Sequence, residues 1–366
     1  MVKPMSIIHK IVRPDILAQT SYQVPPADGM VKLDAMENPY GLPAELKSEL
    51  AAHLAGVALN RYPVPAYREL KNRIGRELGV PAGYDVVLGN GSDELITLLS
   101  VACSKPGAKV MAPVPTFVMY AISARLAGLE FVGVPLQADL SLNLPAMLLE
   151  IQLHRPALLF ISNPNNPTGS WFDEGQLLQL VHAMTDIGLV IVDEAYQSFA
   201  PGSMMAHLPG YANLVVMRTV SKIGLAGLRL GYMAASGDIL AEIDKVRPPY
   251  NVNVLTEAAA GFLLGHMSVF DQQARQICQQ RTELMAELKK IHGVVVFPSE
   301  ANFVLIRVAD AEFIFNNLIK HKILVKNVGK MHALLANCLR VTVSTPDENK
   351  RFVDALLDAL KPQPAP

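Results

Sequence analysis

Short runs of aliphatic and β-branched residues alternate with longer segments of helical periodicity between about residue 85 and residue 235. Such alternation is typical of a mostly parallel α/β sheet. In an open α/β sheet, the ligand crevice lies outside the carboxyl ends of the strands. The polar and turn residues that follow these runs are therefore expected to converge on one site. The predicted strands are 86–88, 110–112, 131–134, 158–161, 190–192, 215–218 and 231–234.

The segments on either side of this sheet predict two further parts of the chain. The first residues contain Pro14, Pro25 and Pro26 and are expected to form an irregular arm over the body or over a second subunit. Towards the C-terminus, helical stretches at 257–291, 311–321 and 347–360 and short strands at 294–297, 302–308 and 339–343 predict a smaller α+β domain. We therefore expect an arm at 1–42, a large domain at 43–255 and a small domain at 256–366.

Charge, hydropathy and cysteine usage exclude several classes of protein. With 32 basic and 33 acidic residues, the chain lacks the positive charge of a nucleic-acid binder, so we expect a small-molecule ligand. Its apolar runs are far shorter than the ~20 residues that a membrane helix needs, and its N-terminus has no apolar signal segment. We therefore expect a mature, cytoplasmic protein. Cys103, Cys278 and Cys338 are widely spaced, which favours buried free thiols over disulfides or a cysteine zinc site.

A candidate phosphate site follows the first predicted strand. Gly91, Ser92, Asp93 and Glu94 open an amphipathic helical segment. Backbone N–H groups at a helix N-terminus bind anions, and here they would point at the carboxyl edge of the sheet. A plain capping box would contain the same residue types, so this motif alone leaves both interpretations open.

A proline-rich turn follows the strand predicted at 158–161. Two X-Pro steps in the segment 163–169 (NPNNPTG) fix a rigid, extended turn. The turn could simply connect a strand to a helix. It could also hold the side-chain amide of Asn166 against a ligand, where the amide would donate a hydrogen bond to an aromatic oxygen.

Asp193 ends a strand that should be buried on both faces. Burying a carboxylate without a partner is unfavourable, so Asp193 should have a cationic or strongly donating neighbour. A metal site, a nucleotide site or a structural ion pair would each provide one. No histidine or cysteine cluster with ligand spacing accompanies it, so we predict no metal site.

Lys222 follows another predicted strand and precedes the glycine-rich, apolar segment 224–231. A lysine in such a setting is desolvated, which lowers its pKa towards reactivity. Lys222 is therefore a candidate nucleophile. Ser221 and Arg229, together with the start of the helix after Gly91, could surround a phosphate.

The combination of these residues favours pyridoxal phosphate (PLP) as the cofactor. Aldehyde chemistry requires a lysine, and keeping the pyridine nitrogen protonated requires an acid. A phosphate-binding helix start and a side-chain amide complete the set. Each feature alone has another explanation, but PLP accounts for all of them together.

An ordered set of motifs extends from about Tyr22 to the last predicted helix. In these motifs the chain resembles the fold-type I PLP-dependent aminotransferases. Among them it is most similar to the histidinol-phosphate aminotransferase family. The resemblance implies a mostly parallel PLP-binding large domain, a smaller α+β C-terminal domain, and an arm that contributes to the small domain and to dimer contacts. The motifs are 37–41 (ENPYG), 60–63 (NRYP), 91–94 (GSDE), 115–117 (PTF), 163–169 (NPNNPTG), 193–196 (DEAY), 221–222 (SK), 227–229 (GLR) and 338–343 (CLRVTV).

The resemblance implies a role for each residue of the cofactor site. Lys222 would bind the cofactor covalently and act as general base and acid, while Asp193 would pair with the pyridine nitrogen. Phe117 stands where the family commonly has a stacked aromatic ring, often tyrosine. Tyr62 would reach the phosphate of the partner subunit's cofactor, which implies a homodimer with shared active sites. Asn166 and the catalytic Tyr196 would contact the phenolic oxygen, and Ser92, Asp93, Ser221 and Arg229 the phosphate.

The resemblance also implies the substrates. Arg340 would take the carboxylate of glutamate, and Lys326 stands where many relatives have an arginine that binds the substrate phosphate. Tyr22, Asn38 and Tyr120 would complete the substrate site. The implied reaction is ping-pong transamination in L-histidine biosynthesis. Imidazole-acetol phosphate and L-glutamate would be converted to L-histidinol phosphate and 2-oxoglutarate, and the reaction would be reversible.

Two alternatives of the same fold stay open, a broad or aromatic aminotransferase and an enzyme similar to threonine-phosphate decarboxylase. Both phosphate-carrying substrates would suit a cation at Lys326. A non-enzymatic PLP-binding regulator would need a DNA-binding domain, which the short arm cannot form. The choice between the enzymes depends on the products they release.

Overall fold

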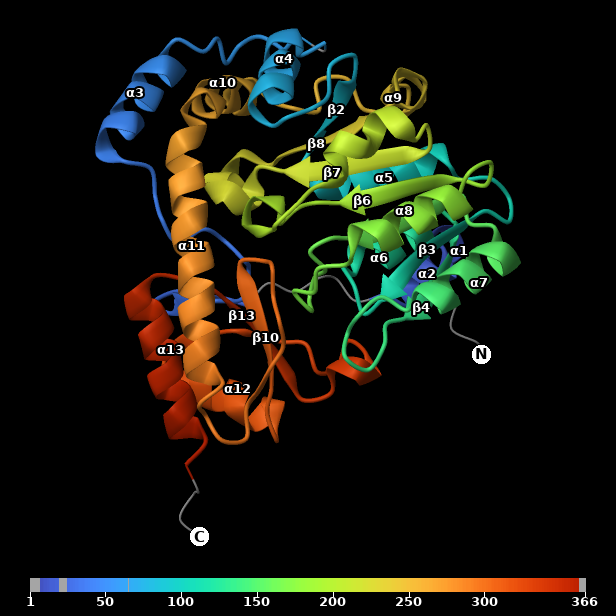
Figure 1. Ribbon diagram of the computed structural model, residues 1–366. Helices are drawn as coiled ribbons and strands as arrows, with labels where there is room; N and C mark the ends of the chain where they lie inside the picture. The colour runs from blue at the N-terminus through green and yellow to red at the C-terminus, as the bar shows by residue number, and fades with distance from the viewer. Residues whose placement is uncertain (1–6, 20–24, 65, 362–366) are drawn as a thin grey trace.

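A seven-stranded sheet lies at the centre of the larger part of the molecule in the computed structural model, which describes residues 7–19, 25–64 and 66–361 (Figure 1). The strand order is β2-β8-β7-β6-β5-β3-β4; the pairs from β7 to β4 are parallel, and β8 runs antiparallel to both neighbours. This confirms the mostly parallel sheet and each predicted strand within it. The strands are β2 (Asp85–Asn90), β3 (Lys109–Val114), β4 (Glu130–Pro135), β5 (Leu158–Ser162), β6 (Leu189–Asp193), β7 (Leu214–Thr219) and β8 (Leu230–Ala235).

Helices cover both faces of this sheet. Successive side chains of a strand point to opposite faces, so Leu159 and Ile161 of β5 pack into one core while Leu158 and Phe160 pack into another. The continuous apolar runs of the central strands reflect this two-sided burial. One face is covered by α5 (Ser92–Ala102), α6 (Met119–Leu126) and α9 (Gly237–Asp244), and the other by α4 (Arg68–Glu77), α7 (Leu144–His154), α8 (Glu174–Ala183) and α10 (Val254–Leu263). Helix α3 (Ala44–Ala55) packs on α10. Within the described ranges, no helix is both long enough and apolar enough to span a bilayer.

A smaller antiparallel sheet lies in the C-terminal part, with the order β12-β13-β10-β9. The long helix α11 (Met267–Leu288) runs past α10 at one end and beside α13 (Pro346–Ala359) at the other, as Figure 1 shows. These elements agree with the helices and strands predicted after residue 256. The remaining bounds are α12 (Ala311–Lys320), β9 (Val295–Val296), β10 (Phe303–Arg307), β12 (Lys326–Asn327) and β13 (Cys338–Thr342).

The N-terminal segment corrects the prediction of a wholly irregular arm. It contains two short helices, α1 (Ile7–Ile11) and α2 (Pro14–Leu17), and Arg13 between them donates hydrogen bonds to backbone oxygens at the end of α6. Pro14 does not interrupt a helix there, because proline is well suited to the first helical turn. Further on, β1 (Val31–Lys32) pairs in parallel with β11 (Ile323–Leu324), which joins this segment to the C-terminal part.

Candidate active site

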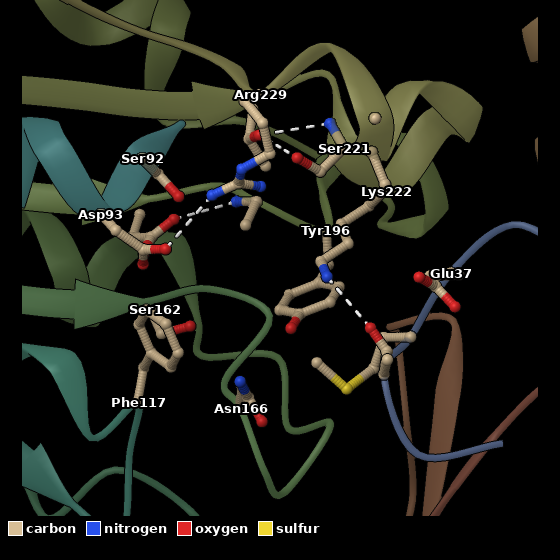
Figure 2. Close-up of a pocket in the computed structure, with 17 residues that line it drawn as sticks. Glu37, Ser92, Asp93, Phe117, Ser162, Asn166, Tyr196, Ser221, Lys222 and Arg229 are labelled. Carbon is tan, nitrogen blue, oxygen red and sulfur yellow. Dashed lines mark hydrogen bonds and ion pairs between the residues drawn. The ribbon is translucent and has the colours of Figure 1, made fainter. Parts of the chain in front are cut away.

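The polar ends of the large sheet's strands meet in one cavity of about 400 Å³. Ser162, Asp193 and Thr219 line it at the carboxyl ends of β5, β6 and β7, and the first residues of α5 line it from the side (Figure 2). The prediction that these residues converge is therefore confirmed. Most of the residues predicted for the cofactor line this cavity, namely Ser92, Asp93, Phe117, Asn166, Asp193, Tyr196, Ser221, Lys222 and Arg229.

Lys222 extends into the cavity from the turn Ser221–Leu225 that follows β7. Its Nζ donates a hydrogen bond to the backbone oxygen of Ala35 at 3.2 Å and lies 5.9 Å from the centroid of the Tyr196 ring (Figure 2). Burial, with a further contribution from the positive charge of Arg340, lowers the pKa of Lys222 to about 8. The neutral, nucleophilic form of this amine is therefore far more abundant near neutral pH than in an exposed lysine, and reaches about half at pH 8.

Asp193 is 3% exposed, and two donors hold its carboxylate. The hydroxyl of Tyr120 donates to Oδ2 at 2.7 Å, and the backbone N–H of Ala195 donates to Oδ1 at 3.1 Å. Burial raises the pKa of Asp193 to about 6, although the bond from Tyr120 acts in the opposite direction. The expected strong donor is present, and it is a phenol rather than a cation. The described residues contain no cluster of side chains that could hold a metal ion.

Tyr120 lies behind Asp193. It lines neither this cavity nor the second cavity that adjoins it. Its side chain is fully buried, stacked on Phe160 with 4.8 Å between ring centroids and edge-on to Phe117 at 5.7 Å. Tyr120 was predicted to contact substrate, but it is not among the residues that line these two cavities. Its position gives it a different role, orienting the carboxylate of Asp193.

A candidate anion site lies where α5 begins. Gly91 has a φ of +82°, and a Cβ there would lie 2.6 Å from Nη2 of Arg229. A Cβ on Gly231 would lie 2.7 Å from the backbone nitrogen of Ser92. Glycine at both positions therefore lets the Arg229 guanidinium approach the N-terminus of α5, where it also pairs with Asp93 at 3.4 Å. Helix N–H groups, a guanidinium and the nearby Ser221 hydroxyl match the needs of a phosphate.

A second cavity, of about 510 Å³, adjoins the first and shares Phe117 and Asn166 with it. Lys326 and Arg340 both line it, as expected of residues that bind anionic substrates. Arg340 donates from Nη1 to Oδ1 of Asn166 and from Nη2 to the backbone oxygen of Asp34, each at 2.6 Å. Since Oδ1 of Asn166 accepts from Arg340, its Nδ2 is turned towards the first cavity (Figure 2). Arg340 thus orients an amide of the cofactor cavity.

Two further predicted residues, Asn38 and Tyr62, line neither cavity. Asn38 donates to Ile223 and Gln273 and accepts from the backbone of Tyr40, so it braces the turn that carries Lys222 instead of contacting substrate. Tyr62 is 79% exposed, away from the cavity of its own chain. Tyr22 lies outside the described residues.

The segment between β1 and the ENPYG motif was missed by the sequence interpretation, although it forms one wall of the site. Ala35 and Met36 line both cavities, Glu37 the first and Asp34 the second. One signal was present in the sequence. Asp34 is an acid within the otherwise apolar run of Leu33, Ala35 and Met36, which indicates a buried carboxylate.

Residues 28–356 match the family model for aminotransferase class I and II. The chain belongs to this aminotransferase family. The aminotransferase is 57% identical over 361 residues to the histidinol-phosphate aminotransferase 1 of Ralstonia nicotianae, a match that covers 98% of this chain and 96% of the relative. It is 51% identical over 349 residues to the histidinol-phosphate aminotransferase of Chromobacterium violaceum, which covers 95% and 98% respectively.

Solved structures confirm the predicted fold-type I architecture of the aminotransferase. The histidinol-phosphate aminotransferase of Clostridium acetobutylicum superposes with a TM-score of 0.82 at 26% identity, over 90% of this chain and 98% of that one. That of Sinorhizobium meliloti, solved with pyridoxal-5'-phosphate, gives 0.84 at 23% identity over 94% and 96%. The threonine-phosphate decarboxylase of Porphyromonas gingivalis gives 0.79 at 24% over 90% and 99%, so the fold alone does not separate these activities.

Proposed function

We propose that this aminotransferase is a PLP-dependent histidinol-phosphate aminotransferase of L-histidine biosynthesis, exchanging an amino group between L-histidinol phosphate and 2-oxoglutarate. One observation carries the proposal. The chain is 57% identical, over nearly its full length, to a histidinol-phosphate aminotransferase, and in it Lys222, the buried Asp193 and the first residues of α5 line a single cavity. An adjoining cavity offers two cations for anionic substrates.

The residues of the first cavity fit PLP. Lys222 provides the amine that binds its aldehyde, and Asp193 the acid for its ring nitrogen. The start of α5 with Arg229 would hold its phosphate, and Phe117 would stack on its ring. Asn166 and Tyr196 would contact its phenolic oxygen, and Ser92, Asp93 and Ser221 would complete the phosphate site. When bound, PLP supplies the electron sink that stabilises the carbanion formed at the substrate Cα.

Lys222 moves the proton in this proposal. Because its pKa is lowered to about 8, the amine at Nζ would serve as the base that takes the proton from the substrate Cα and as the acid that gives it back. Asp193 keeps the ring nitrogen protonated, and Tyr120 fixes the direction of that carboxylate. In the adjoining cavity, Arg340 would bind the glutamate carboxylate and Lys326 the substrate phosphate. Both substrates can therefore use the same cavity in turn.

An absorbance experiment on the purified holoenzyme tests the function. Glutamate should bleach the yellow band of bound PLP, and imidazole-acetol phosphate should restore it; histidinol phosphate and 2-oxoglutarate should do the same in reverse. Restoration by aromatic keto acids but not by imidazole-acetol phosphate would indicate a broad aminotransferase. Release of CO₂ from threonine phosphate, without any need for 2-oxoglutarate, would indicate a decarboxylase.

Tyr120→Phe is expected to lower kcat roughly tenfold, because it removes a hydrogen bond to a buried charged group. It should also shift the acidic limb of the pH profile to higher pH, since the bond from Tyr120 lowers the pKa of Asp193. Tyr84→Phe is the matched control, because its hydroxyl bonds the backbone oxygen of Leu208 far from both cavities. A profile for Tyr120→Phe that keeps its acidic limb in place would contradict the orienting role.

We also propose a homodimer in which Tyr62 reaches the cofactor phosphate of the partner subunit. Tyr62 is 79% exposed and stacks on Tyr250 at 4.6 Å between ring centroids, and Leu59 and Val64 beside it are each 69% exposed. Such a cluster of exposed apolar side chains is typical of a surface that another chain covers.

Sedimentation should give twice the mass of the chain, and Tyr62→Phe should weaken PLP binding by roughly tenfold through loss of one hydrogen bond to a phosphate. Tyr211→Phe serves as the control, since Tyr211 packs against the large-domain core and lines neither cavity. A monomer in sedimentation, or unchanged PLP affinity in Tyr62→Phe, would contradict the shared site.

A cytoplasmic location is the last part of the proposal. The three cysteines are free thiols, but only Cys338 is buried; Cys103 and Cys278 are partly exposed, so the prediction of buried thiols is wrong for these two. Free thiols persist in the reducing cytoplasm, whereas secreted proteins usually pair them. Fractionation of cells that express the tagged protein would test this location.

A further inference from the structure

Asp34 is a buried acid whose side chain no part of the mechanism uses. It follows β1, lines the second cavity and is 7% exposed. Its Oδ1 is buried and meets no hydrogen-bond donor among the residues that the structure describes. Leaving a carboxylate oxygen unsatisfied in such a place is unfavourable unless a ligand supplies the donor.

The other polar side chains that bring an oxygen to this cavity each make a hydrogen bond within the protein. Oδ1 of Asn166 accepts from Arg340 at 2.6 Å, and the hydroxyl of Thr116 donates to Oδ1 of Asn165 at 2.8 Å. The remaining described residues of the lining are apolar or cationic, so Asp34 supplies its one carboxylate. A substrate that brings an N–H group into this cavity would therefore meet Asp34 as its acceptor.

The charges around Asp34 favour one of the two proposed substrates over the other. Lys326 and Arg340 line the same cavity and suit a phosphate or a carboxylate. Glutamate brings a second carboxylate, which the negative charge of Asp34 repels. L-Histidinol phosphate brings an imidazole, whose ring N–H is a hydrogen-bond donor and whose protonated form is a cation.

We propose that Asp34 determines specificity by accepting a hydrogen bond from the imidazole N–H of the substrate, an inference that rests on the proposed function. Arg340 fixes the backbone of Asp34, because its Nη2 donates a hydrogen bond to the backbone oxygen of Asp34 at 2.6 Å. Asp34 thereby favours the imidazole substrate and opposes glutamate in a cavity that both enter.

Steady-state kinetics of the holoenzyme variants Asp34→Asn and Asp34→Ala test the inference. The amine donors are histidinol phosphate, glutamate and the phosphate ester of phenylalaninol, in which a phenyl ring replaces imidazole; the last is measured as a substrate or as a competitive inhibitor. We expect KM for histidinol phosphate to rise roughly tenfold in both variants, with KM for glutamate unchanged or lower and the constant for the phenyl compound unchanged.

Asp28→Asn is the matched control, since it removes an exposed carboxylate from the turn before β1 and should change none of these constants. Asparagine keeps the size of the side chain, and thermal unfolding verifies that each variant is folded. Equal rises in KM for all three compounds, or no rise for histidinol phosphate, would overturn the inference. If the wild type fails to use histidinol phosphate, the proposed function is wrong as well. If the wild type uses it and the KM values of the Asp34 variants keep the same ratios to one another as in the wild type, only the role of Asp34 is wrong.

Discussion

Replacing Lys222 by alanine is expected to lower transamination by about 10⁴-fold or more, because we propose that this one residue both binds the cofactor and moves the substrate proton. The yellow band of the enzyme should disappear with the amine, although PLP can still occupy the anion site at the start of α5. Stopped assays with glutamate and imidazole-acetol phosphate measure the loss. Absorbance scans of the dialysed protein measure the covalent attachment.

The fold should survive this substitution. Burial lowers the pKa of Lys222 to about 8, so its protonated form is disfavoured in the folded chain at neutral pH, and alanine removes that penalty. We therefore expect the apo-variant to unfold at no lower temperature than the wild-type apo-protein. Lys105→Ala, an exposed lysine in a turn before β3, is the control and should keep full activity. Turnover by Lys222→Ala near the wild-type rate would refute the assignment.

The same pKa sets how quickly the wild-type apo-enzyme takes up PLP. Only the neutral amine attacks the aldehyde, and its fraction increases with pH until the pKa of about 8 is passed. The rate of appearance of the yellow band should therefore rise between pH 6 and pH 8 and level off above that.

The central sheet could be predicted from the sequence because its strands are apolar along their whole length. The runs that became β5 and β6 are buried on both faces, so each stands out between polar turns. Strands β1, β11 and β12 have two residues each, which is too short for any periodicity to show. They form only because segments far apart in the chain pair with each other, as Val31 does with Ile323.

The site was predictable where a residue directly follows a strand, and less so elsewhere. Lys222 and Asp193 sit at strand ends, and sheet topology alone brings such residues together. Tyr120 and Asn38 were assigned to substrate from the resemblance, which gives a position along the chain but not the direction of a side chain. Asp34 was missed because most of its neighbours in the cavity come from distant parts of the chain, at 116–122, 166 and 326–340, and only the tertiary fold brings them there.

Asp193→Asn is expected to lower kcat roughly 10²- to 10³-fold, the usual range for removing one preorganised electrostatic partner of a reacting group. Asparagine can still accept from Tyr120 and from the N–H of Ala195, so the local packing is kept. What is lost is the negative charge that keeps the ring nitrogen of PLP protonated. Rates under saturating substrate, with the absorption spectrum of the bound cofactor, measure the effect.

Stability separates this electronic role from a structural one. The pKa of Asp193 is raised to about 6 in the fold, so the stability that it contributes is fully present below about pH 4 and lost as pH rises through 6. At neutral pH its buried charge destabilises the apo-protein, and Asp193→Asn should raise the free energy of unfolding by up to about 3 kcal/mol. Asp186→Asn, at an exposed turn, should change neither stability nor rate. If Asp193→Asn loses stability in parallel with activity, the carboxylate matters for folding. If it loses activity while the protein becomes more stable, the carboxylate acts on the cofactor.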